Sequence, residues 1–266
     1  MKGYLSYFKK ELLAGLQYRA AALAGITTQI FWGLIFIMLY KAFYAHTNIE
    51  SINYQELMCY VWLSQAFFAL IYIRIKDDDI RGSIVDGTVA YELCRPYSLY
   101  WWWYLKLLSK RYATVLLRFS PIIIIGIIIP SPYGLPLPNS LLSFVLFLLT
   151  LFLGSFIVTS FNLITHFITF YTMQDKGTSS IINTFAELLS GFAIPLPLLP
   201  NLIINLGEYL PFRLIGDLPF RVYSGNINTP YAIKSIILQI IWIIILFIIG
   251  SLLMKKSLKK VSVQGG

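Results

Sequence analysis

The sequence predicts an all-α integral membrane protein with about six transmembrane helices, an N-terminal amphipathic interfacial helix and a short cytoplasmic helix. Hydrophobic residues make up 58% of the 266 positions and charged residues 12%, whereas a soluble domain carries roughly 25% charged residues. Apolar runs recur at about the 20 residues that a helix needs to cross hydrocarbon. Basic residues are concentrated in a few segments between those runs. We therefore treat residues 1–266 as a single transmembrane domain.

Residues 1–20 are predicted to form a helix that lies in the membrane interface. At about 100° per residue, Tyr4 and Phe8 fall on one side of this helix, and Lys2 and Lys9 fall on the other. A helix with one apolar and one basic face binds at the level of the lipid headgroups and does not cross the bilayer.

Six apolar runs follow, and each is interpreted as a transmembrane span. They are Leu23–Tyr44, Tyr54–Ile75, Tyr112–Ile129, Leu141–Phe161, Ser179–Leu199 and Tyr231–Leu253. Pro130 ends the third run, and the fourth is expected to continue as a helix to Tyr171. Pro195 and Pro197 predict a kink or an early end in the fifth run, because proline removes a helical hydrogen bond.

The distribution of basic residues predicts the orientation of the chain. Seventeen lysines and arginines lie on the side that carries both ends of the chain, and four lie on the other side. This bias predicts a multi-pass protein of the plasma (cell) membrane with both termini in the cytoplasm. The net charge of +9 is then explained by topology and by contact with the anionic lipid bilayer. We expect no nucleic-acid partner.

Two connecting segments are long enough to carry structure of their own. Residues 200–229 form an extracytoplasmic segment with an apolar stripe at Leu202, Ile203 and Leu206. That spacing predicts a small helix at the outer surface, with or without a gating role. Residues 76–111 form the longest cytoplasmic segment.

The cytoplasmic segment begins with Asp77–Asp79, which are placed to cap the start of a helix. Ile80 and Ile84 share one face of that helix, and such a face can enter a groove on a soluble partner. The alternative is a loop whose charges only fix the topology. The aromatic run Tyr100–Tyr104 is expected to anchor the chain at headgroup level.

Two motifs in this sequence resemble a known family. The first is Gly87-x-Val89-Ala90-Tyr91-x-Leu93-x-Arg95-Pro96, which follows the Asp79–Gly82 turn. The second is Leu189-Ser190-Gly191-x-x-Ile194-Pro195, followed by Pro200 and Leu210-Pro211-Phe212. In order and membrane position, both are similar to the permease subunits of ABC exporters of the ABC type-2 (ABC-2) class. The resemblance covers essentially the whole chain and points to the small six-span branch that includes viologen-exporter-like permeases.

The resemblance implies a permease dimer, either a homodimer or a heterodimer with a second permease, that binds a separate ABC ATPase subunit. ATP and Mg would bind to that partner, and this chain would bind no cofactor and would not be an enzyme. The sequence contains no G-x-x-x-x-G-K-[ST] loop. The residues assigned to ATPase coupling are Asp79, Ile80, Arg81, Gly82, Ile84, Gly87, Tyr91, Arg95 and Pro96. Those assigned to an outer gate are Gly191, Pro195 and Pro211.

Polar residues inside the spans need an explanation, because a charge at the bilayer centre costs about 2.5–3.5 kcal/mol. Glu187 lies midway along the fifth span without a basic partner nearby in sequence. The polar positions at helical spacing are Thr159, Asn162 and His166 on the fourth span, and Ser180, Asn183, Glu187 and Ser190 on the fifth. They either line the translocation path or dimer seam, or hydrogen-bond between helices. We predict no metal site and no catalytic group.

Two alternative functions remain open at this stage. The chain could be a stand-alone secondary transporter that uses Glu187 as its ion-coupling group, or a non-transport membrane scaffold. The residues select no substrate among the drugs, lipids, glycans and peptides that relatives of this class carry. Export is the expected direction.

Overall fold

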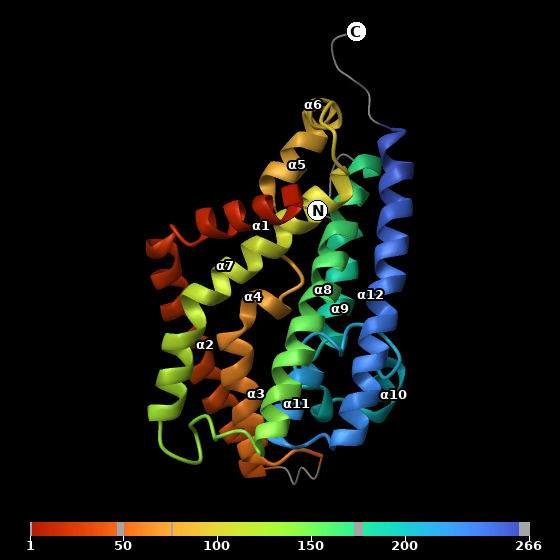
Figure 1. Cartoon of the computed structure of the whole chain (residues 1–266). Coiled ribbons are helices and arrows are strands. Elements are labelled where there is room, and N and C mark those ends of the chain that lie inside the picture. Colours follow the sequence, from red (N-terminus) through yellow and green to blue (C-terminus); the bar gives the residue numbers. More distant parts are fainter. Residues whose placement is uncertain (1, 47–50, 76, 173–177, 261–266) are drawn as a thin grey trace.

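The computed structural model describes residues 2–46, 51–75, 77–172 and 178–260, and within these ranges the chain is helical without strands. Four helices are long and apolar enough to cross a membrane: α2 (Arg19–His46), α7 (Leu99–Ile128), α8 (Leu141–Thr172) and α12 (Thr229–Leu258). They run along the length of the molecule (Figure 1) and carry most of its exposed large hydrophobic side chains. The predicted all-α membrane class is therefore confirmed.

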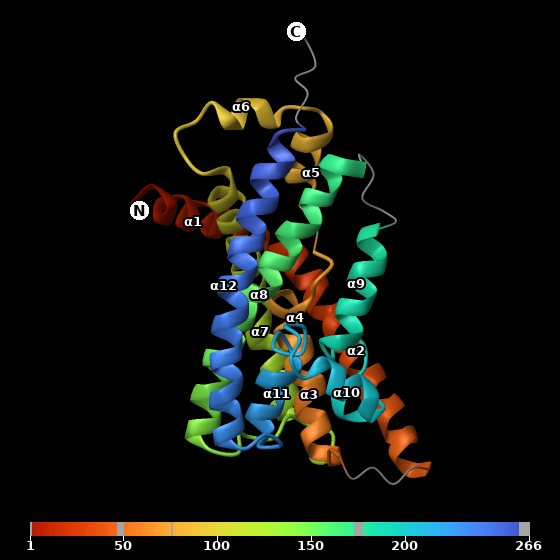
Figure 2. The ribbon, with the colours of Figure 1, turned by 90° about the vertical axis from the view of Figure 1, so that its right-hand side faces the viewer.

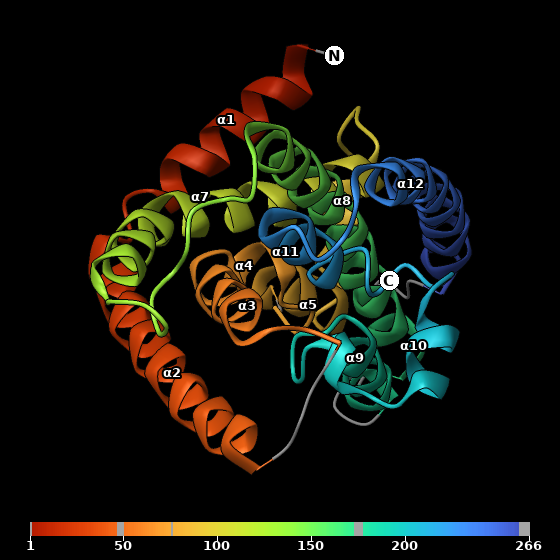
Figure 3. The ribbon, with the colours of Figure 1, turned by 90° about the horizontal axis from the view of Figure 1, so that it is seen from below.

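The second and fifth predicted spans are not continuous helices. The second consists of α3 (Tyr54–Ala66) and α4 (Phe68–Ile71), followed by a non-helical stretch to residue 75. The fifth contains α9 (Thr178–Leu189), which ends before Pro195, as the prolines predicted. Figure 3 shows α3 and α4 in the middle of the molecule, surrounded by longer helices. Protein groups can satisfy a broken backbone at such a position, whereas lipid cannot.

The predicted N-terminal amphipathic helix is present as α1 (Lys2–Gly15). It lies alongside the first half of α7 (Figures 1 and 3), with Gly15 close to Ala113. The Tyr7 ring stacks on Trp102 with 3.5 Å between ring centroids, and Tyr97 stacks on Trp102 at 4.1 Å. The Ser98 backbone N–H donates to the Tyr4 hydroxyl at 2.9 Å. The stack and this hydrogen bond join α1 to the start of α7.

The segment predicted to be cytoplasmic forms α5 (Asp78–Val85) and α6 (Val89–Leu93) at the end of the molecule where α1 lies, with α6 at its tip (Figures 1 and 2). Helix α7 begins at Leu99, well before the predicted start of the third span at Tyr112. The aromatic run is therefore helical, and Trp103 and Tyr104 are buried in the protein core, not placed at headgroup level. Their side chains pack against α5 and α8 in one apolar cluster.

At the opposite end, the predicted outer helix is present as α10 (Asn201–Gly207). A short 3-10 turn, η1 (Leu196–Leu198), precedes it, and α11 (Asp217–Ser224) follows it. Helix α11 packs against α3 and α8, and its Leu218 and Phe220 belong to the main apolar core. The amide of Gln239 on α12 donates to the carbonyls of Thr150 and Leu214, at 2.8 and 2.9 Å, so a buried polar side chain ties this end together.

Candidate functional site

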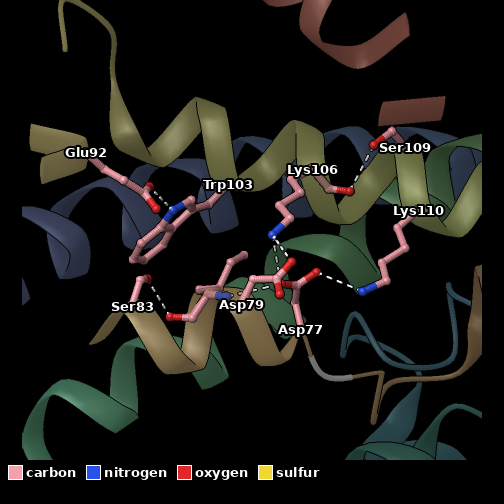
Figure 4. A network of polar contacts seen from close by, with 9 residues as sticks. Asp77, Asp79, Ser83, Glu92, Trp103, Lys106, Ser109 and Lys110 are labelled. Atoms are coloured by element: carbon pink, nitrogen blue, oxygen red, sulfur yellow. Dashed lines mark hydrogen bonds and ion pairs between the residues drawn. The ribbon is translucent and has the colours of Figure 1, made fainter. Parts of the chain in front are cut away.

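Asp77 attaches the segment that contains α5 and α6 to α7 (Figure 4). Its buried carboxylate accepts from Lys106 Nζ at 3.1 Å and from Lys110 Nζ at 3.0 Å. It also caps α5 by accepting the Ile80 backbone N–H at 3.1 Å. Lys106 reaches a second carboxylate, that of Asp79, at 2.7 Å. Charge-assisted hydrogen bonds of this kind hold a helix start in a defined position.

The charges around Asp77 make this attachment pH-dependent. Burial alone would raise the pKa of Asp77, but Lys106 and Lys110 outweigh burial and hold the pKa below its ordinary value of 3.8. A carboxyl whose folded pKa is depressed stabilises the fold fully above its unfolded pKa. That stability is lost as the pH falls through the folded value.

We therefore expect Asp77→Asn to destabilise the protein by about 1–3 kcal/mol at pH 7, the cost of removing one partner of buried hydrogen bonds. The difference from the wild type should shrink below about pH 4. Thermal unfolding of the purified protein between pH 3 and pH 7 measures both effects. Asp78→Asn, an exposed change on the same helix, is the matched control. Equal loss in the two variants would contradict the assigned role of Asp77.

Ile80 and Ile84 do not form a partner-binding face. Both are buried, at 2% and 5% exposure, against Trp103, Phe167 and other side chains of α7 and α8. The expectation that this face enters a groove on a partner is therefore wrong. The reason is that α5 uses its apolar face to attach to the rest of the chain.

Apart from Asp78 and Asp79, the exposed side chains of this segment lie on and beside α6. Tyr91 is 77% exposed and Leu93 is 43% exposed, and Val85, Arg95 and Pro96 are also exposed. We call these five residues the α6 tip. Gly87, at φ +71°, makes the turn between α5 and α6. Arg81 and Gly82, both half-buried, lie within α5.

Helix α6 is also attached to α7. The Trp103 indole N–H donates to Glu92 Oε2 at 2.8 Å (Figure 4), and Val89 is fully buried beside it. The α6 tip therefore sits on a base fixed to α7 by a charged cluster and an indole hydrogen bond. Through the stack of Tyr97, Trp102 and Tyr7, the same base contacts α1.

The polar stripe on α8 faces the non-helical stretch after α4. Thr159, Asn162 and His166 are all buried. The Asn162 amide donates to the backbone carbonyls of Ile73, at 3.2 Å, and Ile75. Thr159 donates within its own helix. The Asn162 bonds favour the packing interpretation for that residue, whereas the bond of Thr159 within α8 favours neither interpretation.

Glu187 on α9 has a basic partner that the sequence did not reveal. Arg74, in the turn after α4, donates its Nε to Glu187 Oε1 at 2.7 Å and its Nη2 to Thr184 Oγ1 at 2.7 Å. The expectation that Glu187 lacks such a partner is therefore wrong. Arg74 is one of the seventeen basic residues from which the orientation of the chain is predicted. Of the remaining α9 positions, Asn183 and Ser190 are buried and Ser180 is exposed.

The residues assigned to an outer gate are buried at the end of α9 and beyond it. The Gly191 carbonyl accepts from the Tyr60 hydroxyl at 2.9 Å, and Gly191 has φ +74°. Pro195 precedes η1, and Pro211 lies in the turn between α10 and α11. The structure places Gly191 beside α3, so this turn is held by packing across helices. The gating role stays a prediction.

Arg111 is a buried polar residue whose role the sequence did not reveal. Its Nη1 donates to the carbonyls of Ala69 and Tyr72, at 2.8 and 2.9 Å, where α4 ends. It follows Tyr104, Leu107 and Leu108 at helical spacing, and that spacing places it on the buried face of α7. Within the described ranges, no three His, Cys, Asp or Glu side chains are grouped to hold a metal ion.

Long apolar helices around broken inner helices define an all-α integral membrane protein. A family model described as "ABC-2 family transporter protein" matches residues 25–265. The chain therefore belongs to the ABC-2 family of transporter proteins, and it is a membrane component of an ABC transporter. A comparison with curated proteins found no match. The match begins at residue 25, so α1 lies outside it.

Proposed function

We propose that this chain is the membrane-spanning permease subunit of an ABC exporter, driven by ATP hydrolysis on a separate ATPase subunit. The translocation path forms between this chain and a second permease, which is either a second copy or a related chain. ATP and Mg bind to the ATPase, and this chain binds no cofactor. The complex lies in the plasma membrane with both termini of this chain in the cytoplasm.

The observation that carries the proposal is the combination of an exposed tip and a fixed base. Tyr91 and Leu93 present apolar area beyond the membrane-length helices, where a soluble partner can bury it. Asp77 and Glu92 attach the same segment to α7. A force on the α6 tip is therefore transmitted to α7, because these contacts fix the segment to that helix.

The link continues from α5 toward the polar stripe on α9. Arg74 lies three positions before Asp77 in the chain and pairs with Glu187. A displacement of α5 therefore moves Arg74 relative to Glu187. We assign this ion pair and its neighbours on α9 to the interface between the two permeases. Ile181 and Phe185 on α9 are exposed and are expected to contact lipid or the second permease.

A stand-alone transporter is the main alternative, and a proteoliposome experiment separates the two. We expect efflux of methyl viologen only when this chain, its ATPase subunit and ATP are all present. A proton gradient alone should drive no flux. Flux without the ATPase that disappears in Glu187→Gln would overturn the proposal. Glu11→Gln, on α1, is the matched control. If no member of a panel of drugs and lipids moves under any condition, the scaffold alternative holds.

A further inference from the structure

A polar pocket lies at the end of the molecule opposite the α6 tip. It has a volume of about 280 Å³ and opens between α10, the chain leading into α11 and the start of α12. Its charged and hydrogen-bonding walls are formed by Glu208, Arg213, Arg221, Asn226 and Tyr231. This is near the lower end of the size range of small-molecule sites, and it suits one polar headgroup.

Arg213 is the unusual residue of this pocket. It is only 5% exposed, and its Nε has no hydrogen-bond partner among the described residues. Its Nη2 donates to the Tyr231 hydroxyl at 2.7 Å, and the guanidinium lies 5.2 Å from the centre of that ring. No carboxylate of the described chain forms an ion pair with it. Asp217 acts on Arg213 electrostatically without an ion-pair contact, so the guanidinium keeps hydrogen-bond donors for an anionic ligand.

The other charges of the pocket are arranged differently. Arg221 is compensated, because it pairs with Asp217 at 3.3 Å and donates to Asn226 Oδ1 at 2.7 Å. Glu208 Oε1 accepts from the Tyr231 hydroxyl at 2.8 Å. The Tyr231 hydroxyl therefore stands between the Arg213 guanidinium and the Glu208 carboxylate. The pocket offers one positive and one negative pole, separated by a single hydroxyl group.

We propose that this pocket binds a phosphate joined to an ammonium group by a short linker, the unit found in ethanolamine phosphates. The phosphate pairs with the Arg213 guanidinium, whose planar donors suit phosphate oxygens. The ammonium group pairs with Glu208. Helix α10, beside the pocket, exposes Leu202 and Leu206, Tyr209 just after it is also exposed, and acyl chains can cover this apolar surface. The same unit occurs in phosphatidylethanolamine and in free phosphoethanolamine, and the experiment distinguishes them.

Binding is measured on the full-length chain, purified in detergent and depleted of lipid, by native mass spectrometry. Probes are phosphatidylethanolamine, phosphatidylglycerol with the same acyl chains, and free phosphoethanolamine. We expect the wild type to bind phosphatidylethanolamine at least about ten-fold more tightly than phosphatidylglycerol. Glu208→Gln should remove this preference by weakening only phosphatidylethanolamine. Arg213→Gln should weaken both lipids by at least about ten-fold.

Lys234→Gln removes the same charge from an exposed position of α12 and should change neither affinity by more than about two-fold. If free phosphoethanolamine displaces phosphatidylethanolamine, the site is assigned to a soluble ligand. If it does not, the site is assigned to the lipid. Equal affinities of the wild type for both lipids would overturn the proposal. So would equal losses in Arg213→Gln and Lys234→Gln. If Arg213→Gln does not fold, the proposal is tested by Glu208→Gln, because Glu208 is only half-buried. A preference for phosphatidylethanolamine that survives in Glu208→Gln would then overturn the proposal. The assay needs no ATPase, so it is independent of the proposed transport function.

Discussion

Replacing Tyr91 with alanine is expected to weaken binding of the ATPase subunit about thirty-fold and to remove most permease-stimulated ATP turnover. Tyr91 is the most exposed large side chain of the α6 tip, at 77%. Truncation of a central aromatic anchor typically costs about 2 kcal/mol in an interface, which corresponds to that change in affinity. ATP hydrolysis by the reconstituted complex and co-purification of the ATPase subunit are the two measurements.

Tyr18→Ala is the matched control, because Tyr18 is also strongly exposed but lies between α1 and α2. Arg95→Ala should act in the same direction as Tyr91→Ala, since it lies on the same exposed tip. Point substitutions test the coupling role more cleanly than deletion of residues 87–96, which would also remove the buried Val89 and the Glu92 contact to Trp103. Unchanged turnover in both point variants would reject docking at the α6 tip.

The second large effect is expected at the turn that ends α9. A side chain added at Gly191 would place its Cβ 2.1 Å from the Tyr60 hydroxyl oxygen and 3.2 Å from Asp217 Cβ. The positive φ adds strain of about 1–2 kcal/mol for an L-residue, and overpacking adds about 1–3 kcal/mol. Against a total stability of about 5–15 kcal/mol, Gly191→Ala should lower the unfolding temperature sharply and reduce the yield of monodisperse protein.

Two further variants separate the causes of that loss. Gly191→Ala combined with Tyr60→Phe removes the hydroxyl that the new methyl group meets, so it should recover the overpacking cost and keep the backbone strain. Tyr60→Phe alone measures the loss of the hydrogen bond to the Gly191 carbonyl, which the comparison subtracts. Gly3→Ala is the control, because nothing lies within 4 Å of a Cβ at that exposed helical position. Unfolding of Gly191→Ala at the wild-type temperature would show that the turn relaxes freely.

Much of the fold could be predicted from the sequence because the long outer helices have simple apolar patterns. Helices α2, α8 and α12 fall close to predicted spans, and the stripes on residues 1–20 and 201–207 predicted α1 and α10. The break between α3 and α4 could not be predicted. An apolar run has the same hydropathy whether it faces lipid or protein. The end of α4 depends on Arg111 and the non-helical stretch after it on Asn162, and these side chains come from α7 and α8.

The candidate site was predicted less completely, for a related reason. The motif around Gly87 and Arg95 placed the exposed segment correctly in the chain, but periodicity cannot say which neighbour covers the face of Ile80 and Ile84. The pairing of Arg74 with Glu187 joins residues 113 positions apart. Only the return of α9 past the end of α4 brings them together, and single-sequence patterns contain no information on such long-range contacts.

The enclosure of α3 also bears on how sequences of this fold can diverge. Every residue from Leu57 to Ala66 is buried, so each side of that helix meets protein. Helix α12 buries only a single stripe that includes Gln239 and Gly250. Neutral drift should therefore be fast on most of α12, where one aliphatic residue replaces another at little cost, and slow around the whole circumference of α3. The two helices should then accumulate substitutions at very different rates.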